Sequence, residues 1–144
     1  MYPIVRRKIL APQVFELEIA APLIAAQAQA GQFVIVIPSS TGERVPFTLA
    51  DWNKEKGTIT LVIQVLGKTS AALMEENMTT LEHVSGPLGE PTTILPEAKK
   101  VLVTGGGLGI AAIHPIMRAY HQQKTEVTGL MGFRTADLIF WKDE

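Results

Sequence analysis

The chain has 144 residues, 47% of them hydrophobic, which is enough for one ordinary domain, or one domain and part of a second, with a sizeable core. Its formal net charge of -1 provides no general electrostatic attraction for nucleic acid or for an anionic membrane surface. The apolar runs are too short to span a bilayer and the N-terminus lacks the apolar segment of a signal peptide, so we expect a cytoplasmic protein without membrane insertion.

Residues 1–97 are predicted to form a small antiparallel β domain. Polar and apolar side chains alternate in residues 14–19, as on a half-buried strand, and residues 33–37 are a β-branched run typical of a core strand. The predicted strands cover residues 4–10, 14–20, 33–37, 45–50, 58–66 and 81–84, with a charged turn at 51–57 and a rigid loop at 86–91. The predicted helices are a turn at 22–30 and a helix at 70–77 that Thr69 or Ser70 caps. Short strands at this spacing favour a barrel or a sandwich.

Residues 98–144 are predicted to begin a second, α/β domain, with the boundary near residues 96–99. A strand at 100–104, a helix at 109–123, a strand at 126–131 and the start of a helix at 135–143 follow one another, and this order implies a parallel sheet. A dinucleotide-binding half needs about three strands. The edge of the second strand is therefore expected to be unpaired and the nearby apolar side chains exposed, namely Leu138, Ile139, Phe140 and Trp141. Either the chain is truncated, which we favour, or a second copy completes it as a homo-oligomer.

Four glycines separate the first strand of this second domain from its helix: Gly105, Gly106, Gly107 and Gly109. The first two are expected to turn the chain off the strand, and the last two to let backbone N–H groups approach a pyrophosphate. A strand, a glycine turn and a helix in this order are typical of a site where the helix N-terminus binds a dinucleotide phosphate. A tightly packed glycine turn without a ligand is the alternative.

The glycine stretch is the last of four motifs that occur in a fixed order, at residues 44–51, 64–70, 86–89 and 101–115. Together they resemble the ferredoxin-NADP reductase superfamily. Within it the likeness is closest to the flavoprotein subunit of NADH-dependent ferredoxin:NADP oxidoreductase (sulfide dehydrogenase) and to the dihydroorotate dehydrogenase electron-transfer subunit. The resemblance covers nearly the whole chain and implies an antiparallel, Greek-key, FAD-binding β-barrel followed by a partial Rossmann-like parallel-sheet domain for NAD(P). The family is longer than this chain, which is why truncation is favoured.

The resemblance assigns the first motif to the flavin. It implies that Arg44 meets the FAD pyrophosphate, that Pro46 and Phe47 lie along the isoalloxazine, and that the Thr48 hydroxyl, the catalytic candidate, is placed near flavin N5. Arginine suits its role because a guanidinium binds phosphate oxygens bidentately and stays charged. Val45 is an insertion relative to the commoner family form. Taken alone, Arg44 could equally be a solvated loop charge and Phe47 a core residue.

The second motif opens a helix, whose N-terminus would take the flavin pyrophosphate. The resemblance implies cofactor contacts here from Gln64, Val65, Gly67, Lys68, Thr69 and Ser70. Gln64 and Val65 would line the flavin with their main chain. Without the resemblance, an ordinary capped helix explains this stretch better.

The glycine turn would receive the pyrophosphate of a nicotinamide nucleotide. The ribose of such a nucleotide is normally recognised at the end of the second strand, where this chain carries no acidic residue and Arg134 follows. Arg134 could hold a 2′-phosphate, which favours NADP(H), or it could be a pyrophosphate contact or an exposed structural residue. His114, in the helix, is expected to be a packing residue, because hydride transfer between two aligned rings needs no histidine base.

The function implied by the resemblance is hydride transfer from NAD(P)H to FAD, followed by release of single electrons to an iron-sulfur or other flavoprotein subunit. The chain has no cysteine and its three histidines lack metal-ligand spacing, so no metal site is predicted in it. The [2Fe-2S] cluster common in these flavoproteins would need thiolates from a missing segment or a partner. The alternatives are a flavin- or nucleotide-binding fragment without turnover and an interaction module without a cofactor.

Overall fold

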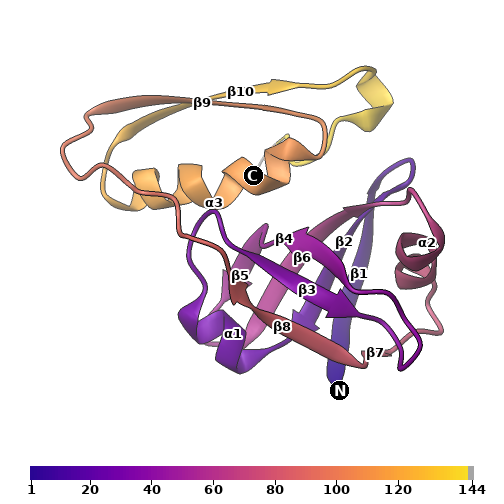
Figure 1. Ribbon diagram of the computed structural model, residues 1–144. Coiled ribbons are helices and arrows are strands. Elements are labelled where there is room, and N and C mark those ends of the chain that lie inside the picture. Colours follow the sequence, from indigo (N-terminus) through magenta and orange to yellow (C-terminus); the bar gives the residue numbers. More distant parts are fainter. Residues whose placement is uncertain (143–144) are drawn as a thin grey trace.

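The structure, a computed structural model, describes residues 1–142. A larger domain of mostly antiparallel strands carries a smaller unit, in which helix α3 lies between a two-stranded sheet and the larger domain (Figure 1). No helix among these residues is long and apolar enough to cross a membrane. In chain order the elements are β1 (Tyr2–Ala11), β2 (Val14–Ala20), α1 (Pro22–Gln27), β3 (Phe33–Ile37), β4 (Val45–Thr48), β5 (Asp51–Asn53), β6 (Thr58–Gln64), α2 (Lys68–Met74), β7 (Thr80–Leu81), β8 (His83–Leu88), β9 (Lys100–Gly106), α3 (Gly109–Gln122), β10 (Glu126–Gly132) and the 3-10 turn η1 (Ala136–Leu138).

Two antiparallel sheets enclose the core of the larger domain, one ordered β5-β6-β2-β1-β7 and the other β4-β3-β8. On β2 the side chains of Phe15, Leu17 and Ile19 are fully buried, as their alternation with polar residues predicts. Val14 and Glu16, on the opposite face of β2, are buried as well, because the smaller unit covers that face. No ladder among residues 1–142 joins the two sheets, so the predicted barrel is a barrel-like pair of sheets rather than a closed one.

Two stretches of the larger domain differ from the prediction. The turn expected at 51–57 begins with a strand, β5, because Asp51 pairs with Thr60 on β6. The loop expected at 86–91 begins inside β8, which pairs with β3. Gly86 permits this pairing, since a Cβ there would lie 2.6 Å from Val34 Cγ1.

The smaller unit contains two parallel strands, β9 and β10, connected by α3. Their register runs from Lys100 opposite Glu126 to Gly106 opposite Gly132. One face of this sheet packs on α3, and Gly105 allows close packing, because a Cβ there would lie 2.8 Å from Ile113 Cδ1. An antiparallel β domain followed by a parallel α/β unit is the predicted fold class, which is confirmed. Residues 89–99, where the domain boundary is predicted, form neither helix nor strand.

The other face of the two-stranded sheet is uncovered. Leu102 and Leu130 lie on it and are 65% and 63% exposed. Each strand is paired only with the other among residues 1–142, so the edge of β10 is open there, as expected.

The structure differs most from the prediction in the segment after β10. The helix expected at 135–143 is only the short turn η1, and Asp143 lies outside the described residues. Phe140, expected to be exposed, is 5% exposed, and Trp141 is half-buried. The physical reason is a second apolar cluster, which joins the two parts of the chain and includes Phe140. Its buried members are Ala11, Val14, Ala50 and Val62 of the larger domain, Ile110 and Ala111 of α3, and Phe140.

Candidate functional site

Strand β4, which carries part of the first motif, and the start of α3 line one cavity of about 250 Å³. Its lining includes Pro46, Phe47 and Thr48 of β4, Val62 of β6, and Leu108, Gly109 and Ala112 at the start of α3. The structure therefore brings together two motifs that are far apart in the sequence.

Local chemistry explains why β4 can present these side chains. β4 is the edge strand of the three-stranded sheet, so Pro46 removes no ladder hydrogen bond that a central strand would need. Phe47 is half-buried and packs against the core, whereas Thr48 is exposed. The Thr48 hydroxyl is thus available at the cavity.

The glycine turn differs in detail from the prediction. Gly105 and Gly106 belong to β9, and the chain turns at Gly107, whose φ of 52° favours glycine. The Gly107 amide, predicted to face a pyrophosphate, donates instead to the Gly132 carbonyl at 2.8 Å. The amides of Leu108 and Gly109 make no hydrogen bond within residues 1–142. A Cβ added to Gly109 would meet no atom within 4 Å, so there is open space on this side of the residue.

A second, larger cavity of about 750 Å³ continues from this turn. Gly106, Gly107 and Leu108 line it together with Arg134. Arg134, which is predicted to bind a 2′-phosphate, therefore lies at the same cavity as the turn predicted to bind a pyrophosphate. Gln64, which is exposed at the end of β6, lines the same cavity from the larger domain. Its lining is Val14, Gln64, Leu66, Gly106, Gly107, Leu108, Gly132, Phe133, Arg134, Leu138 and Phe140.

The second motif, predicted to bind the flavin pyrophosphate, forms the capped start of a helix. The Ser70 hydroxyl accepts hydrogen bonds from the amides of Leu66, at 2.9 Å, and Gly67, at 3.0 Å, and the Thr69 hydroxyl donates to Glu43 at 3.0 Å. Both hydroxyls predicted to bind phosphate are therefore engaged, and α2 begins at Lys68, with Gly67 as its N-cap, rather than at 70. The remaining groups of this motif are the exposed Lys68 side chain and the first amides of the helix, which have no acceptor in the described part of the chain.

Two more of the residues predicted to bind flavin, Arg44 and Val65, lie near this helix. Glu43 bonds to Thr69, so the loop that carries Arg44 lies beside the N-terminus of α2. Arg44 is exposed and forms no ion pair within residues 1–142. Val65 is half-buried, and its amide donates to the Gln13 carbonyl at 2.8 Å. Neither Arg44 nor Lys68 lines the 250 Å³ cavity.

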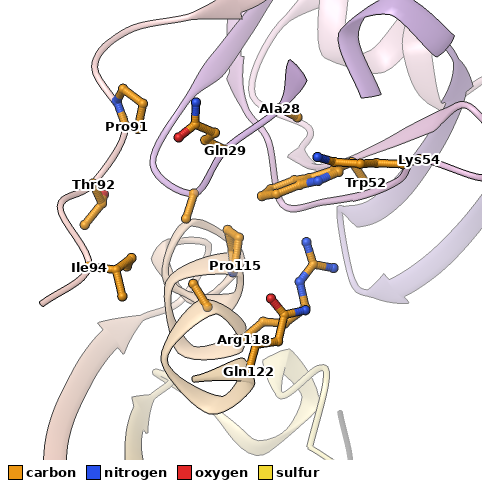
Figure 2. Close-up of a pocket in the computed structure, with 12 residues that line it drawn as sticks. Ala28, Gln29, Trp52, Lys54, Pro91, Thr92, Ile94, Pro115, Arg118 and Gln122 are labelled. Carbon is orange, nitrogen blue, oxygen red and sulfur yellow. The ribbon is translucent and has the colours of Figure 1, made fainter. Parts of the chain in front are cut away.

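A contact that the sequence reasoning missed joins α3 to β5. The guanidinium of Arg118 forms an ion pair with Asp51 and lies 4.6 Å from the centre of the Trp52 ring. Figure 2 shows Arg118 reaching from α3 toward Trp52 beside a cavity of about 440 Å³. Burial lowers the pKa of Arg118 from its ordinary value, because desolvation disfavours the charged form. One helical turn earlier, His114 Nδ1 lies 3.2 Å from the Ala50 carbonyl.

No family model matches the chain. The chain is 37% identical over 142 residues to a Thermotoga maritima protein named as a homologue of the electron-transfer subunit of NAD+-dependent dihydroorotate dehydrogenase B, covering 98% of this chain and 50% of that protein. It thus spans about half the length of the curated relatives it matches.

Two solved structures place the fold. The NADH-dependent reduced ferredoxin-NADP oxidoreductase superposes with a TM-score of 0.92 at 36% identity, over 99% of this chain and 52% of that chain. The ferredoxin-NADP+ reductase of Plasmodium falciparum superposes with a TM-score of 0.78 at 16% identity, over 99% of this chain and 62% of that chain, and shows the fold alone. The resemblance read from the four motifs is confirmed: these similarities, over about half the length of each relative, support the ferredoxin-NADP reductase superfamily.

Proposed function

We propose that this chain holds FAD and the first part of an NAD(P)H site in a flavoprotein oxidoreductase. In this function a hydride passes from NAD(P)H to FAD, and single electrons pass on to an iron-sulfur or other flavoprotein subunit. The names of two relatives support it, one an electron-transfer subunit homologue and the other an NADH-dependent ferredoxin-NADP oxidoreductase. We also propose residues 1–97 as the flavin domain and 98–144 as the beginning of the nucleotide domain.

The observation that carries the proposal is the shared cavity between β4 and α3. Hydride transfer requires the two reacting rings to be held together in alignment. The apolar surface of Pro46 and Phe47 suits a flat aromatic ring, and the free amides of Leu108 and Gly109 suit an anionic group. The residues present therefore fit both groups.

The chain's own side chains would have distinct roles. Thr48 would donate its hydroxyl proton near flavin N5 and so orient the ring. Arg44 and Lys68 would neutralise the flavin pyrophosphate. Because the hydroxyls of Thr69 and Ser70 are already bonded, we assign the phosphate contact of this helix to the amides of Lys68 and Thr69.

On the nucleotide side, we assign the pyrophosphate to the amides of Leu108 and Gly109, with Gly105, Gly106 and Gly107 shaping the turn. Arg134 would hold the 2′-phosphate of NADP(H) beside it. Bound FAD would supply the redox chemistry, and the protein supplies position and charge. The ligands of an iron-sulfur cluster would have to come from outside these 144 residues, which contain no cysteine.

The test is a ferricyanide reduction assay with NADH and, separately, NADPH. The purified chain is compared before and after reconstitution with FAD and removal of unbound flavin by gel filtration. We expect turnover only with bound FAD, and a clear preference for one nucleotide. Retention of no flavin would contradict the proposal.

A second candidate is a flavin-binding unit without turnover of its own. The uncovered face of the β9–β10 sheet supports it, since Leu102 and Leu130 are largely exposed there and the described part of the nucleotide site has only two strands. The same assay separates the two candidates. Firm flavin retention without reduction by either nucleotide would favour the second.

A further inference from the structure

The face of α3 that looks toward the larger domain contacts the chain directly after β4. His114 Nδ1 lies 3.2 Å from the Ala50 carbonyl, and Arg118, one turn later on the same face, forms an ion pair with Asp51. Asp51 begins β5, which follows Thr48 after only Leu49 and Ala50. The helix that starts at the dinucleotide turn is therefore attached close to the flavin strand.

The attachment point on the larger domain is rigid. Leu49 and Ala50 are both fully buried. The Leu49 amide donates to the Gln32 carbonyl at 3.0 Å, and the Ala50 amide donates to the Thr60 carbonyl at 2.9 Å. A displacement of Asp51 would therefore also move the end of β4, because the two residues between them are buried and hydrogen-bonded.

Arg118 makes two contacts at once. Its guanidinium pairs with Asp51 and stacks over Trp52, with the centre of the ring 4.6 Å away (Figure 2). Its side chain is only 28% exposed, so solvent screens the pair less than it would at an open surface. Only arginine combines a planar face for stacking with a fork of donors for a carboxylate.

We propose that Arg118 is a positioning residue, which holds α3 against β5 so that the Leu108–Gly109 turn faces Thr48 across the cavity. The inference rests on the proposed function, because its consequence is the alignment of nucleotide and flavin. Arg118 lies more than two helical turns after Gly109 and does not line the cavity. Arg118 acts by fixing the orientation of α3 relative to β5.

A structural test uses spin labels, since the chain has no cysteine of its own. Lys56→Cys in the larger domain and Thr128→Cys on β10 are both exposed positions for a nitroxide pair. We expect a single narrow distance distribution by pulsed dipolar spectroscopy in the parent protein. Arg118→Met, which keeps an apolar stem but removes the charge and the planar group, should broaden the distribution and lengthen its mean. Asp51→Asn should broaden it too, and the double variant should add nothing further.

Lys54→Met is the matched control. Lys54 lines the same 440 Å³ cavity and carries the same charge, but it forms no ion pair within residues 1–142. Its distance distribution should match that of the parent. An unchanged distribution in Arg118→Met, or an equal change in Lys54→Met, would overturn the inference.

A kinetic test asks whether the position matters for the reaction. At saturating nucleotide, Arg118→Met should slow flavin reduction by about tenfold to hundredfold, which is the order of effect that a small misalignment produces, with a smaller change in KM. Flavin retention and the flavin spectrum should stay as in the parent. If Arg118→Met does not fold, Arg118→Lys, which keeps the charge but loses the planar group, should give a smaller decrease in the same direction.

The two proposals fail in different ways. A parent protein that retains FAD but is reduced by neither nucleotide would contradict the proposed hydride transfer, and the spin-label distances would still decide whether Arg118 sets the helix position. A parent that is reduced normally, with Arg118→Met reduced at the same rate, would overturn the positioning role alone.

Discussion

Thr48, the last residue of β4, and Gly109, the first residue of α3, line the same cavity of about 250 Å³. One belongs to the motif assigned to the flavin and the other to the motif assigned to the nicotinamide nucleotide. Their meeting across a single cavity is what makes a transfer between two cofactors physically reasonable.

Removing the Thr48 hydroxyl tests the flavin side of this cavity. Thr48→Val keeps the shape and the β-branch of a strand residue but removes the only polar group of the side chain. We expect flavin to be retained and its reduction by nucleotide to slow by about tenfold or more, as for the loss of one positioned donor. Thr128→Val, on the exposed face of β10, is the control and should leave the rate unchanged. Equal rates in all three proteins would remove Thr48 from the proposed site.

A pair of glycine substitutions separates the two cofactor sites. A Cβ at Gly67 or at Gly109 would meet no atom within 4 Å, and neither residue has a positive φ, so both Ala variants should fold. Gly109→Ala places a methyl group where the nucleotide pyrophosphate would approach, and should weaken nucleotide binding by tenfold or more, on the order of one lost charge-assisted hydrogen bond. Gly67→Ala should weaken FAD retention instead.

The measurements are fluorescence titration with nucleotide and flavin content after gel filtration. Each variant serves as the control for the other. The assignment would be contradicted if both variants affected the same ligand, or if neither affected any.

Arg134 tests the choice of nucleotide. Because it lies beside the glycine turn in the 750 Å³ cavity, Arg134→Met should weaken NADPH binding by about tenfold while NADH binding changes little. Lys99→Met removes one positive charge from an exposed position outside this cavity and serves as the charge-matched control. An equal loss of affinity for both nucleotides would make Arg134 a pyrophosphate contact instead.

Phe140 tests the cluster that joins the two parts of the chain. It is 5% exposed, and Phe140→Ala should lower the free energy of unfolding by about 3 kcal/mol, as for other buried aromatic truncations. Ile139, its neighbour, is 45% exposed, and Ile139→Ala should cost less than about 1 kcal/mol. Urea denaturation followed by tryptophan fluorescence measures both. Equal effects would contradict the packing seen at Phe140.

The strands with the clearest patterns could be predicted from the sequence. Residues 14–20 and 33–37 were predicted to the residue, because alternation and a β-branched run each reflect local burial. β5 could not be found in the same way, because the three residues Asp51–Asn53 are mostly polar and are a strand only through pairing with β6.

The prediction of a helix after residue 135 is wrong for the opposite reason. The apolar residues 138–141 suggest a helix, but η1 ends at Leu138, and Phe140 and Trp141 pack against α3 and the larger domain. Trp141 packs 4.9 Å from the His114 ring and donates to Glu16 at 3.3 Å. Contacts with distant parts of the chain determine the conformation of this segment, and no local sequence pattern shows these contacts.

In the candidate site, too, some features could be predicted from the sequence and others depend on tertiary contacts. The ordered motifs identified β4, α2 and the glycine turn, and the structure brings β4 and the turn together. The hydrogen bond from the Gly107 amide to the Gly132 carbonyl depends on the pairing of β10 with β9. The spacing of the glycines does not predict this bond. Arg118 was missed because its partners, Asp51 and Trp52, lie on another domain. Its only sequence signal is a spacing of one helical turn from His114.

The most direct measurement of the central claim is the visible absorption spectrum of the FAD-loaded protein during anaerobic addition of NADH and, separately, of NADPH. The account predicts that the flavin bands bleach with at least one nucleotide, more readily with NADPH if Arg134 binds the 2′-phosphate. Flavin bands that persist with both nucleotides would contradict hydride transfer at the cavity between Thr48 and Gly109.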